Sequence, residues 1–296
     1  LVASTGVIGV PLNIDAIKEG IPIAIAQLNS YGGHSAAEAI ITTDTATKEI
    51  SIEFQINGTP VVIGAMAKGS GMIHPNMATM LSFITTDLNI DAKLLKEALK
   101  SSVDISYNRV SVDGDSSTND MVVILANGLA NNDNINEKDH NYYTFLEALN
   151  TLNIHLAKEI AKDGEGATKL IECNVSGCKN EKSAEILAKS VINSSLVKTA
   201  IFGSDANWGR VLCALGYANT EFNPNLVTVE FACETDSILV CANGCYVEFD
   251  EGKAKEILLK DDVKININLH SGNASATAWG CDLTYDYVKI NGDYRS

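Results

Sequence analysis

Residues 68–83 combine a polar loop that contains glycines with a run of strand-like residues, and Ala78 and Thr79 lie where the two meet. A threonine that opens a strand after a small residue can attack its own upstream carbonyl carbon. If the chain breaks there, the new α-amine of Thr79, with a pKa of about 7.7 to 8.0, lies beside the hydroxyl and can accept its proton. This is the arrangement of an N-terminal nucleophile. In most proteins, however, such a pair is ordinary β-branched packing at the start of a strand.

Two metal-binding patterns can be tested against the spacing of the remaining polar residues. The cysteines and histidines form no zinc motif, because Cys241 and Cys245 flank an expected turn and no HExxH pattern exists. Residues 113–120 are acidic enough to suggest a calcium loop, but glycine is absent from the sixth position and Ile124 stands where glutamate is required. We therefore expect no metal, and the cysteines are interpreted as core residues.

The composition describes a folded globular chain of 296 residues, of which 46% are hydrophobic and 20% charged. Its 22 Lys and Arg residues against 37 Asp and Glu residues give a formal charge of −15. Such a charge repels phosphate backbones and anionic lipids, so we expect neither nucleic acid nor a membrane as partner. No run approaches the ~20 apolar residues of a membrane-spanning helix. An odd number of cysteines, 7, indicates a reducing, cytoplasmic setting.

Two β-hairpins are predicted where an Asn-Gly pair separates alternating apolar runs, because a type I′ turn needs positive φ at both central residues. The first places Asn57 and Gly58 between residues 50–56 and 61–63. The second places a like pair between residues 238–242 and 245–249.

Helical periodicity of 3.6 residues appears in several segments of the chain. These segments are residues 36–40, 91–103, 142–161, 184–192 and 252–259. Strands and helices do not alternate regularly as in a doubly wound sheet, which favours an α+β fold of layers. The polar stretch at residues 174–183 is the best candidate for a domain boundary.

The sequence closely resembles the ornithine acetyltransferase (glutamate N-acetyltransferase) family of arginine biosynthesis. The resemblance runs from the first residues to the last and rests on many long blocks in one order. These are residues 3–9, 42–45, 68–73, 75–81, 108–115, 117–120, 164–169, 207–210 and 290–296.

The resemblance implies a role for individual residues. It implies self-cleavage between Ala78 and Thr79, with Thr79 as the nucleophile of the downstream chain. Thr5 and Gly6 match the pair that forms the oxyanion hole, as acyl transfer requires. The remaining matches are to substrate-contacting positions, and they are Thr42, Lys68, Glu165, Asn291 and Ser296. Among these, Lys68 and Glu165 offer opposite charges to a substrate that carries an α-carboxylate and an α-ammonium group.

The resemblance also implies an architecture like that of the related N-terminal-nucleophile aminopeptidases, a layered α/β/β/α sandwich. A catalytic region is expected over residues 1–173 and a smaller C-terminal α+β unit, whose tail reaches the active site, over residues 174–296. Cleavage would give chains of residues 1–78 and 79–296, which are expected to assemble as α2β2.

The expected reaction moves the acetyl group of N-acetylornithine to glutamate through an acetyl-threonine intermediate, with no cofactor. Acetyl-CoA remains open as a second donor. Two alternatives also stay open: a hydrolase of the same architecture, and a binding or assembly protein without catalysis. Three positions depart from the family pattern, namely Ala206, Gly292 and Ser296. Relatives also carry a substantial segment before residue 3, and this chain begins with Leu1, so we expect a truncated or processed chain without a signal peptide.

Overall fold

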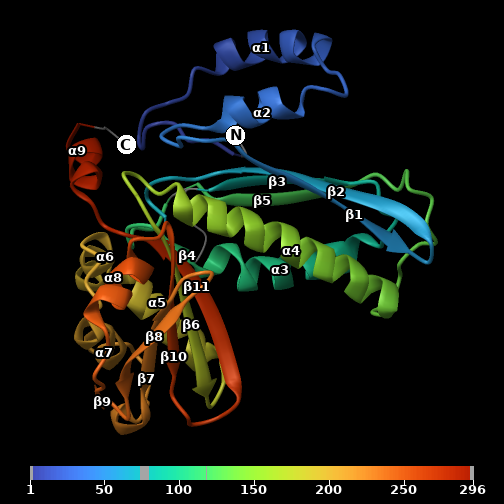
Figure 1. Cartoon of the computed structure of the whole chain (residues 1–296). Helices are drawn as coiled ribbons and strands as arrows, with labels where there is room; N and C mark the ends of the chain where they lie inside the picture. The colour runs from blue at the N-terminus through green and yellow to red at the C-terminus, as the bar shows by residue number, and fades with distance from the viewer. Residues whose placement is uncertain (1–2, 74–79, 118, 294–296) are drawn as a thin grey trace.

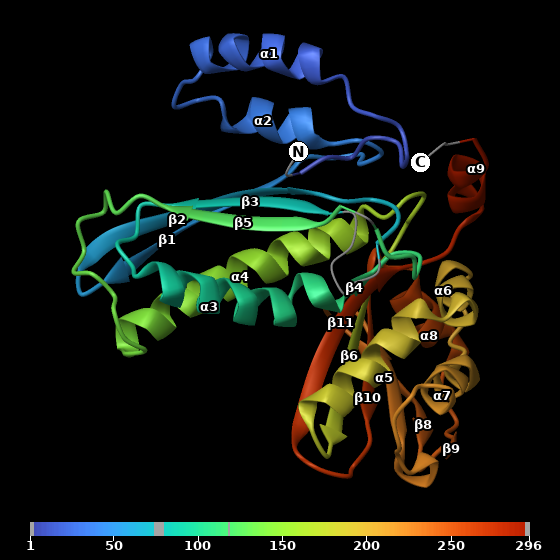
Figure 2. The same cartoon turned by 180° about the vertical axis from the view of Figure 1, so that it is seen from behind.

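Two β-sheets and nine α-helices make up residues 3–73, 80–117 and 119–293, which are the residues that this computed structural model describes. Figures 1 and 2 show the sheets as two separate bodies of strands that run in different directions, each with helices against it. The α+β class expected from the sequence is confirmed.

The first sheet has four strands in the order β1-β2-β3-β5. Their bounds are Lys48–Ile56, Thr59–Lys68, Leu81–Thr86 and Met121–Ala126. The first predicted hairpin is confirmed: β1 and β2 pair antiparallel, and Asn57 and Gly58 between them have φ values of 50° and 81°. Strand β3 pairs antiparallel with β2 and parallel with β5.

Two helices cover one face of this sheet, α3 (Ala92–Ile105) and α4 (His140–Lys162). Asp91 caps α3, as the sequence predicts, because its carboxylate accepts the N–H groups of Lys93 and Leu94. Helix α4 presents fully buried side chains such as Phe145 to the strands, and they form one hydrophobic core with the inward residues of β2 and β3.

The second sheet has seven strands in the order β4-β11-β6-β10-β7-β8-β9. Their bounds are Val110–Ser111, Ala274–Cys281, Leu170–Cys178, Asp262–Asn268, Thr228–Ala232, Ser237–Ala242 and Cys245–Tyr246. Four helices accompany this sheet and supply a second core with it. They are α5 (Glu181–Asn193), α6 (Ser195–Phe202), α7 (Trp208–Gly216) and α8 (Glu251–Leu258).

The second predicted hairpin is correct in its turn and too long in its outgoing strand. Asn243 and Gly244 adopt positive φ, but β9 ends at Tyr246 rather than at residue 249. Asp250 instead caps helix α8 through the N–H of Lys253, which turns the chain away from the edge of the sheet.

The polar stretch at residues 174–183, expected to mark a boundary, is strand β6 as far as Cys178 and the first turn of helix α5 from Glu181. Residues 173 and 174 both lie inside β6, between β11 and β10. The segment is therefore not a linker, and the division of the chain at this point remains a prediction.

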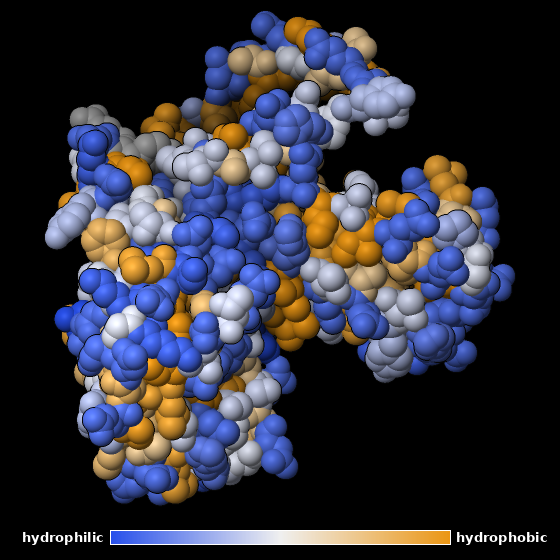
Figure 3. Space-filling model, in the orientation of Figure 1, coloured by the Kyte–Doolittle hydropathy of each residue, from blue (hydrophilic) through white to orange (hydrophobic). Residues whose placement is uncertain are grey.

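Two helices lie at the ends of the chain and bury no residue of their own. Helix α1 (Ile14–Ala26) exposes apolar side chains such as Ile23 and Ile25, and Figure 3 shows apolar residues along it at the top of the molecule. Helix α9 (Tyr285–Asp293) follows β11. Within the described residues, no helix is long and apolar enough to cross a membrane.

Lys169 ties two helices to the start of β6. Its ammonium group is buried and donates to the carbonyls of Ile201 and Leu258 at 2.8 and 2.6 Å, in the last turns of α6 and α8. It also donates to Ser204 at 2.8 Å. A cation at two helix C-termini is favourable, and burial accounts for the lowered pKa of Lys169.

Replacing Lys169 with methionine is expected to lower the free energy of unfolding by about 2 kcal/mol, because the carbonyls lose a charged donor in a buried place. Urea denaturation followed by tryptophan fluorescence measures this. Lys253→Met is the matched control, since Lys253 makes only an exposed ion pair with Asp236 and should change stability by less than about 0.5 kcal/mol. Equal effects of the two substitutions would contradict the role of Lys169.

Candidate active site

Lys68 is a buried lysine at the end of β2, with only 2% of its surface exposed. Its ammonium group donates a hydrogen bond of 2.9 Å to the hydroxyl of Thr42 and lies 3.6 Å from a carboxylate oxygen of Asp44. Thr42 follows helix α2 (Gly33–Ile40), so the structure brings together two of the expected substrate-contacting residues. Burial lowers the pKa of Lys68, and the charge of Asp44 opposes that effect.

Asp44 is the buried counter-charge of this site, and no role was expected for it. Its carboxylate accepts hydrogen bonds of 2.8 Å from the ammonium of Lys48 and 2.8 Å from the N–H of Gly69. Burial alone would raise the pKa of Asp44, but these bonds hold it below its usual value. The signal was present in the sequence, since Asp44 is the charged member of the block at residues 42–45.

Lys48 connects this cluster to the end of helix α4. Its ammonium group lies 2.5 Å from Asp163, the residue that follows α4. Asp163 also accepts the N–H groups of Thr45 and Ala46. Segments that are far apart in the sequence are thereby fixed to each other, and the chain that leaves Asp163 leads directly to Glu165.

Glu165 and Asn291 meet on the other side of the loop that follows β2. The amide nitrogen of Asn291, on α9, donates to the Glu165 carboxylate at 2.9 Å. The N–H of Glu165 donates to the carbonyl of Ser70 at 2.9 Å. The negative charge of Glu165 also acts on Lys68 and raises its pKa slightly against the effect of burial. Four of the expected residues, Thr42 and these three, therefore belong to one polar site.

Gly71 allows the Glu165 carboxylate to pack directly against the backbone. A Cβ atom at residue 71 would lie 2.3 to 2.5 Å from the carboxyl carbon and oxygens of Glu165. Gly71→Ala must therefore displace the carboxylate. We expect kcat/KM for acetyl transfer to fall about tenfold, equivalent to ~1.4 kcal/mol.

A control for Gly71→Ala is available on α9, beside Asn291. A Cβ atom at Gly292 would meet nothing within 4 Å, so Gly292→Ala should leave kcat/KM unchanged. Steady-state kinetics give kcat/KM of the two variants. Full activity of Gly71→Ala would show that acetyl transfer does not depend on the present position of the Glu165 carboxylate.

Thr5 and Gly6 are both exposed. The N–H of Gly6 donates to the hydroxyl of Ser4 at 3.3 Å. Within residues 3–73, 80–117 and 119–293, no hydrogen bond or ion pair joins either residue to Lys68 or Glu165. The assignment of Thr5 and Gly6 to the oxyanion hole remains a prediction. The predictions for Ala78, Thr79 and Ser296 fall outside the described residues.

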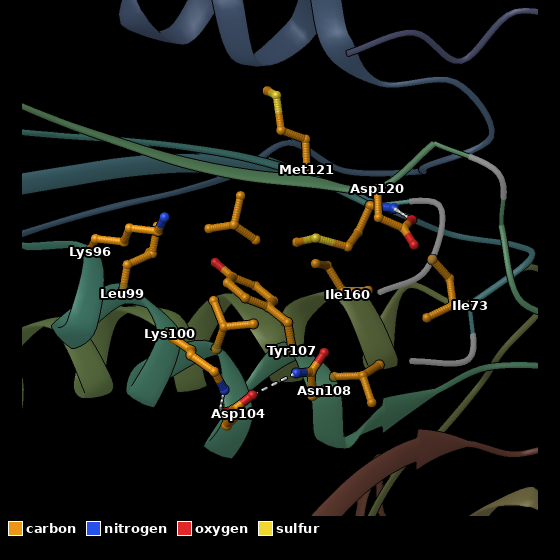
Figure 4. Close-up of a pocket in the computed structure, with 14 residues that line it drawn as sticks. Ile73, Lys96, Leu99, Lys100, Asp104, Tyr107, Asn108, Asp120, Met121 and Ile160 are labelled. Carbon is orange, nitrogen blue, oxygen red and sulfur yellow. Dashed lines mark hydrogen bonds and ion pairs between the residues drawn. The ribbon is translucent and has the colours of Figure 1, made fainter. Parts of the chain in front are cut away.

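An apolar cavity of about 340 Å³ lies between the first sheet and helices α3 and α4. Figure 4 shows Asp120 and Ile73 at one end of it and Lys96 and Leu99 at the other. Asp120 precedes β5 and accepts the N–H of Met80 at 3.1 Å. Burial raises the pKa of Asp120 to about 6. Sequence reasoning quoted the block that contains Asp120 but assigned it no part in the site.

The part of the chain that the structure describes contains no cluster of side chains suited to bind a metal ion. No group of three or more His, Cys, Asp or Glu side chains there could hold an ion. The expectation of a metal-free site remains a prediction.

The α+β fold and a polar site with a buried lysine and a buried glutamate are features of an enzyme that acts on a small molecule. The chain belongs to the ArgJ family, whose model matches residues 1–296. The family expected from the sequence blocks is confirmed.

Two similar proteins are both described as arginine biosynthesis bifunctional proteins. "Arginine biosynthesis bifunctional protein ArgJ 1" of Clostridium acetobutylicum is 55% identical over 296 residues, which is 100% of this chain and 72% of that protein. "Arginine biosynthesis bifunctional protein ArgJ" of Caldanaerobacter subterraneus is 50% identical over 296 residues, or 100% of this chain and 73% of that protein.

A solved structure is also similar. The crystal structure of the arginine biosynthesis bifunctional protein ArgJ from Bacillus halodurans matches with a TM-score of 0.69 and 48% sequence identity. The match covers 73% of this chain and 100% of the solved chain.

Proposed function

We propose that this chain transfers an acetyl group from N-acetylornithine to glutamate and acts in arginine biosynthesis. The observation that carries the proposal is the polar site that joins the buried Lys68 and Glu165 to the exposed Thr42 and Asn291 in a member of the ArgJ family. The names of the similar proteins support the pathway, since each is called an arginine biosynthesis bifunctional protein.

The charges of the site match the two ends of an amino acid. Lys68 is placed to bind an α-carboxylate, with the hydroxyl of Thr42 as a second donor. Glu165, which accepts a hydrogen bond from the amide of Asn291, is assigned to bind an ammonium group. N-acetylornithine offers an α-carboxylate and a side-chain ammonium group, since its α-nitrogen is an uncharged amide, whereas glutamate offers an α-carboxylate and an α-ammonium group. Each substrate thus carries one carboxylate and one ammonium group for Lys68 and Glu165, so one site can hold donor and acceptor in turn. Ser296 at the C-terminus is assigned as a further substrate contact.

The proposed reaction has two half-reactions of the same kind. The Thr79 hydroxyl oxygen attacks the acetyl carbonyl carbon while the α-amine of Thr79 takes the hydroxyl proton. The amide C–N bond breaks, and that proton passes to the leaving nitrogen of ornithine. Glutamate then attacks the acetyl-threonine ester through its amine, and the Thr79 oxygen recovers a proton. Thr5 and Gly6 are assigned to stabilise the oxyanion in both steps.

The nucleophile requires a prior cut between Ala78 and Thr79. The extent of the structural match supports this step, because the whole of the solved Bacillus halodurans chain corresponds to 73% of this chain. Residues 79–296 also make up about three quarters of the sequence. A relative whose solved polypeptide has the length of the expected downstream fragment is consistent with a family that cleaves itself.

Several finer properties belong to the same proposal. The cut chains are proposed to assemble as α2β2 in the cytoplasm, with no cofactor and no metal. The word "bifunctional" in the names of the relatives supports acetyl-CoA as an additional acetyl donor to glutamate.

Acetyl exchange with labelled N-acetylornithine tests the function. With glutamate present, the label should appear in N-acetylglutamate, and a single turnover should leave one acetyl group on Thr79. Release of labelled acetate at the same rate with and without glutamate would instead identify a hydrolase. Absence of both products, together with an uncut chain, would indicate a protein without catalysis.

A further inference from the structure

The segment between β4 and β5 contacts the chain on both sides of residues 74–79. At its start, the N–H of Val112 donates to the carbonyl of Ile73 at 2.8 Å. At its end, the N–H of Met121 donates to the carbonyl of Met80 at 3.1 Å. One segment thus contacts both Ile73, five residues before Ala78, and Met80, which directly follows Thr79.

Two aspartates of this segment accept the backbone N–H groups of the same flanks. Asp113 accepts the N–H of Met72 at 2.7 Å through one carboxylate oxygen and that of Ile73 at 3.0 Å through the other. Asp120 accepts the N–H of Met80 at 3.1 Å. Both ends are therefore bound through N–H and C=O groups alike, and the aspartates supply the charged acceptors.

We propose that Asp113 and Asp120 are positioning residues that hold the two flanks of the junction between Ala78 and Thr79. This inference rests on the proposed function, in which that junction is cut and Thr79 becomes the nucleophile. Neither aspartate is assigned contact with substrate. Their part is to restrict where the junction can lie, since a reacting group misplaced by about 1 Å loses much of its rate.

The environment of both carboxylates favours a positioning role over a stabilising one. Burial raises the pKa of Asp113 even though it accepts three backbone N–H groups, and burial raises the pKa of Asp120 as well. A folded state that raises the pKa of a carboxyl group is destabilised by keeping it ionised at neutral pH. Asp113 and Asp120 therefore carry a cost in stability, and a role of their hydrogen bonds in the reaction accounts for that cost.

Asp113 also connects the junction to the substrate site. Burial raises the pKa of Tyr287, on α9, and the negative charge of Asp113 raises it further; the same helix carries Asn291, which donates to Glu165. Asp113 therefore acts on the helix that carries a residue assigned to the substrate.

The two aspartates should act at different stages. After the cut, Asp113 holds the upstream fragment, which ends five residues beyond Ile73. Asp120 holds Met80, the residue next to the nucleophile. Asp113 is therefore needed mainly for cleavage, whereas Asp120 is needed for cleavage and for every later turnover.

The test compares Asp113→Ala, Asp120→Ala and the control Asp115→Ala, an exposed aspartate of the same segment. We expect cleavage to slow at least tenfold in the first two variants and to be unchanged in the control. Once cut, Asp113→Ala should transfer acetyl groups within threefold of the wild-type kcat, while Asp120→Ala should be at least tenfold slower. Asp113→Asn and Asp120→Asn keep an accepting oxygen and should recover part of the cleavage rate.

Amide hydrogen exchange supplies a readout that does not depend on cleavage. In chains kept uncut by Thr79→Ala, Asp113→Ala should speed exchange of the Met72 and Ile73 amides at least tenfold, and Asp120→Ala that of Met80. If an alanine variant fails to fold, the asparagine variant is measured in its place, with a smaller change of the same sign. Unchanged exchange at these amides would overturn the inference, as would wild-type cleavage rates. A wild-type chain that is never cut would count against the proposed function alone.

Discussion

Replacing Thr79 with alanine is expected to leave a single polypeptide of 31.6 kDa and to lower acetyl transfer by at least about 10⁴-fold. The substitution removes the hydroxyl that attacks the upstream carbonyl and, with it, the only route to a free α-amine at this position. Intact-mass analysis and N-terminal sequencing report the cleavage. Transfer of label from N-acetylornithine to glutamate reports the activity.

Thr79→Ser is the matched control, because it keeps the hydroxyl and loses only a methyl group. It should still be cut at the same bond and should retain measurable transfer. A new N-terminus at residue 79 in the alanine variant, or transfer at the wild-type rate, would show that another group performs the chemistry.

Asp44→Ala is expected to lower the free energy of unfolding by about 3 to 5 kcal/mol, the typical cost of removing one partner from a buried ion pair. Lys68 would lose the carboxylate 3.6 Å from its ammonium group, and the N–H of Gly69 would lose its acceptor. Urea denaturation of uncut Thr79→Ala chains, with and without the Asp44 substitution, measures the difference.

The pH dependence of this difference has a definite sign. The folded protein lowers the pKa of Asp44 below its ordinary value of 3.8, so its contribution to stability is present above that value. The contribution is lost as pH falls through the lower, folded-state pKa. The deficit of the variant should therefore shrink in acid.

Asp15→Ala serves as the control, since Asp15 pairs with Lys18 in an exposed i,i+3 position and should contribute less than about 0.5 kcal/mol. A loss at Asp44 no larger than at Asp15 would mean that Lys48 and Lys68 are adequately compensated without it.

The sequence predicted correctly those turns and helix caps that depend only on neighbouring residues. The Asn57-Gly58 turn and the Asp91 cap need only the residues next to them, and both are found where expected. Helix α1 was not predicted, because it contains Pro22, a residue that usually ends or kinks a helix. Helix α9 was missed as well, since Gly292 and Asn291 are poor helix formers.

Strand β6 shows why the sequence did not identify this polar segment as a strand. Cys173 and Val175 are buried on one face, while the intervening Asn174 lies on the other. There it bonds to side chains of the neighbouring strands, Asn266 at 3.0 Å and Thr277 at 2.8 Å. The partners lie about a hundred positions away in the chain, so composition alone could not identify the segment as a central strand.

The candidate site likewise contains residues that the sequence predicted and residues that only the structure shows. Thr42, Lys68, Glu165 and Asn291 were reached through resemblance to a family, and the structure gives them a common location. Asp44, Asp113 and Asp120 were not assigned, because each acts through contacts with backbone groups far away in the sequence. Spacing within a motif contains no information about such contacts.

The pairing of β2 with β3 has a consequence for the life of the mature protein. The proposed cut falls between these two adjacent strands, so one sheet becomes shared by two polypeptides, joined along the register from Ile63 opposite Thr86 to Lys68 opposite Leu81. Before the cut, folding is a unimolecular process. After it, recovery from unfolding requires two fragments to find each other and becomes dependent on concentration. The mature enzyme would thus persist through slow unfolding rather than through ready refolding.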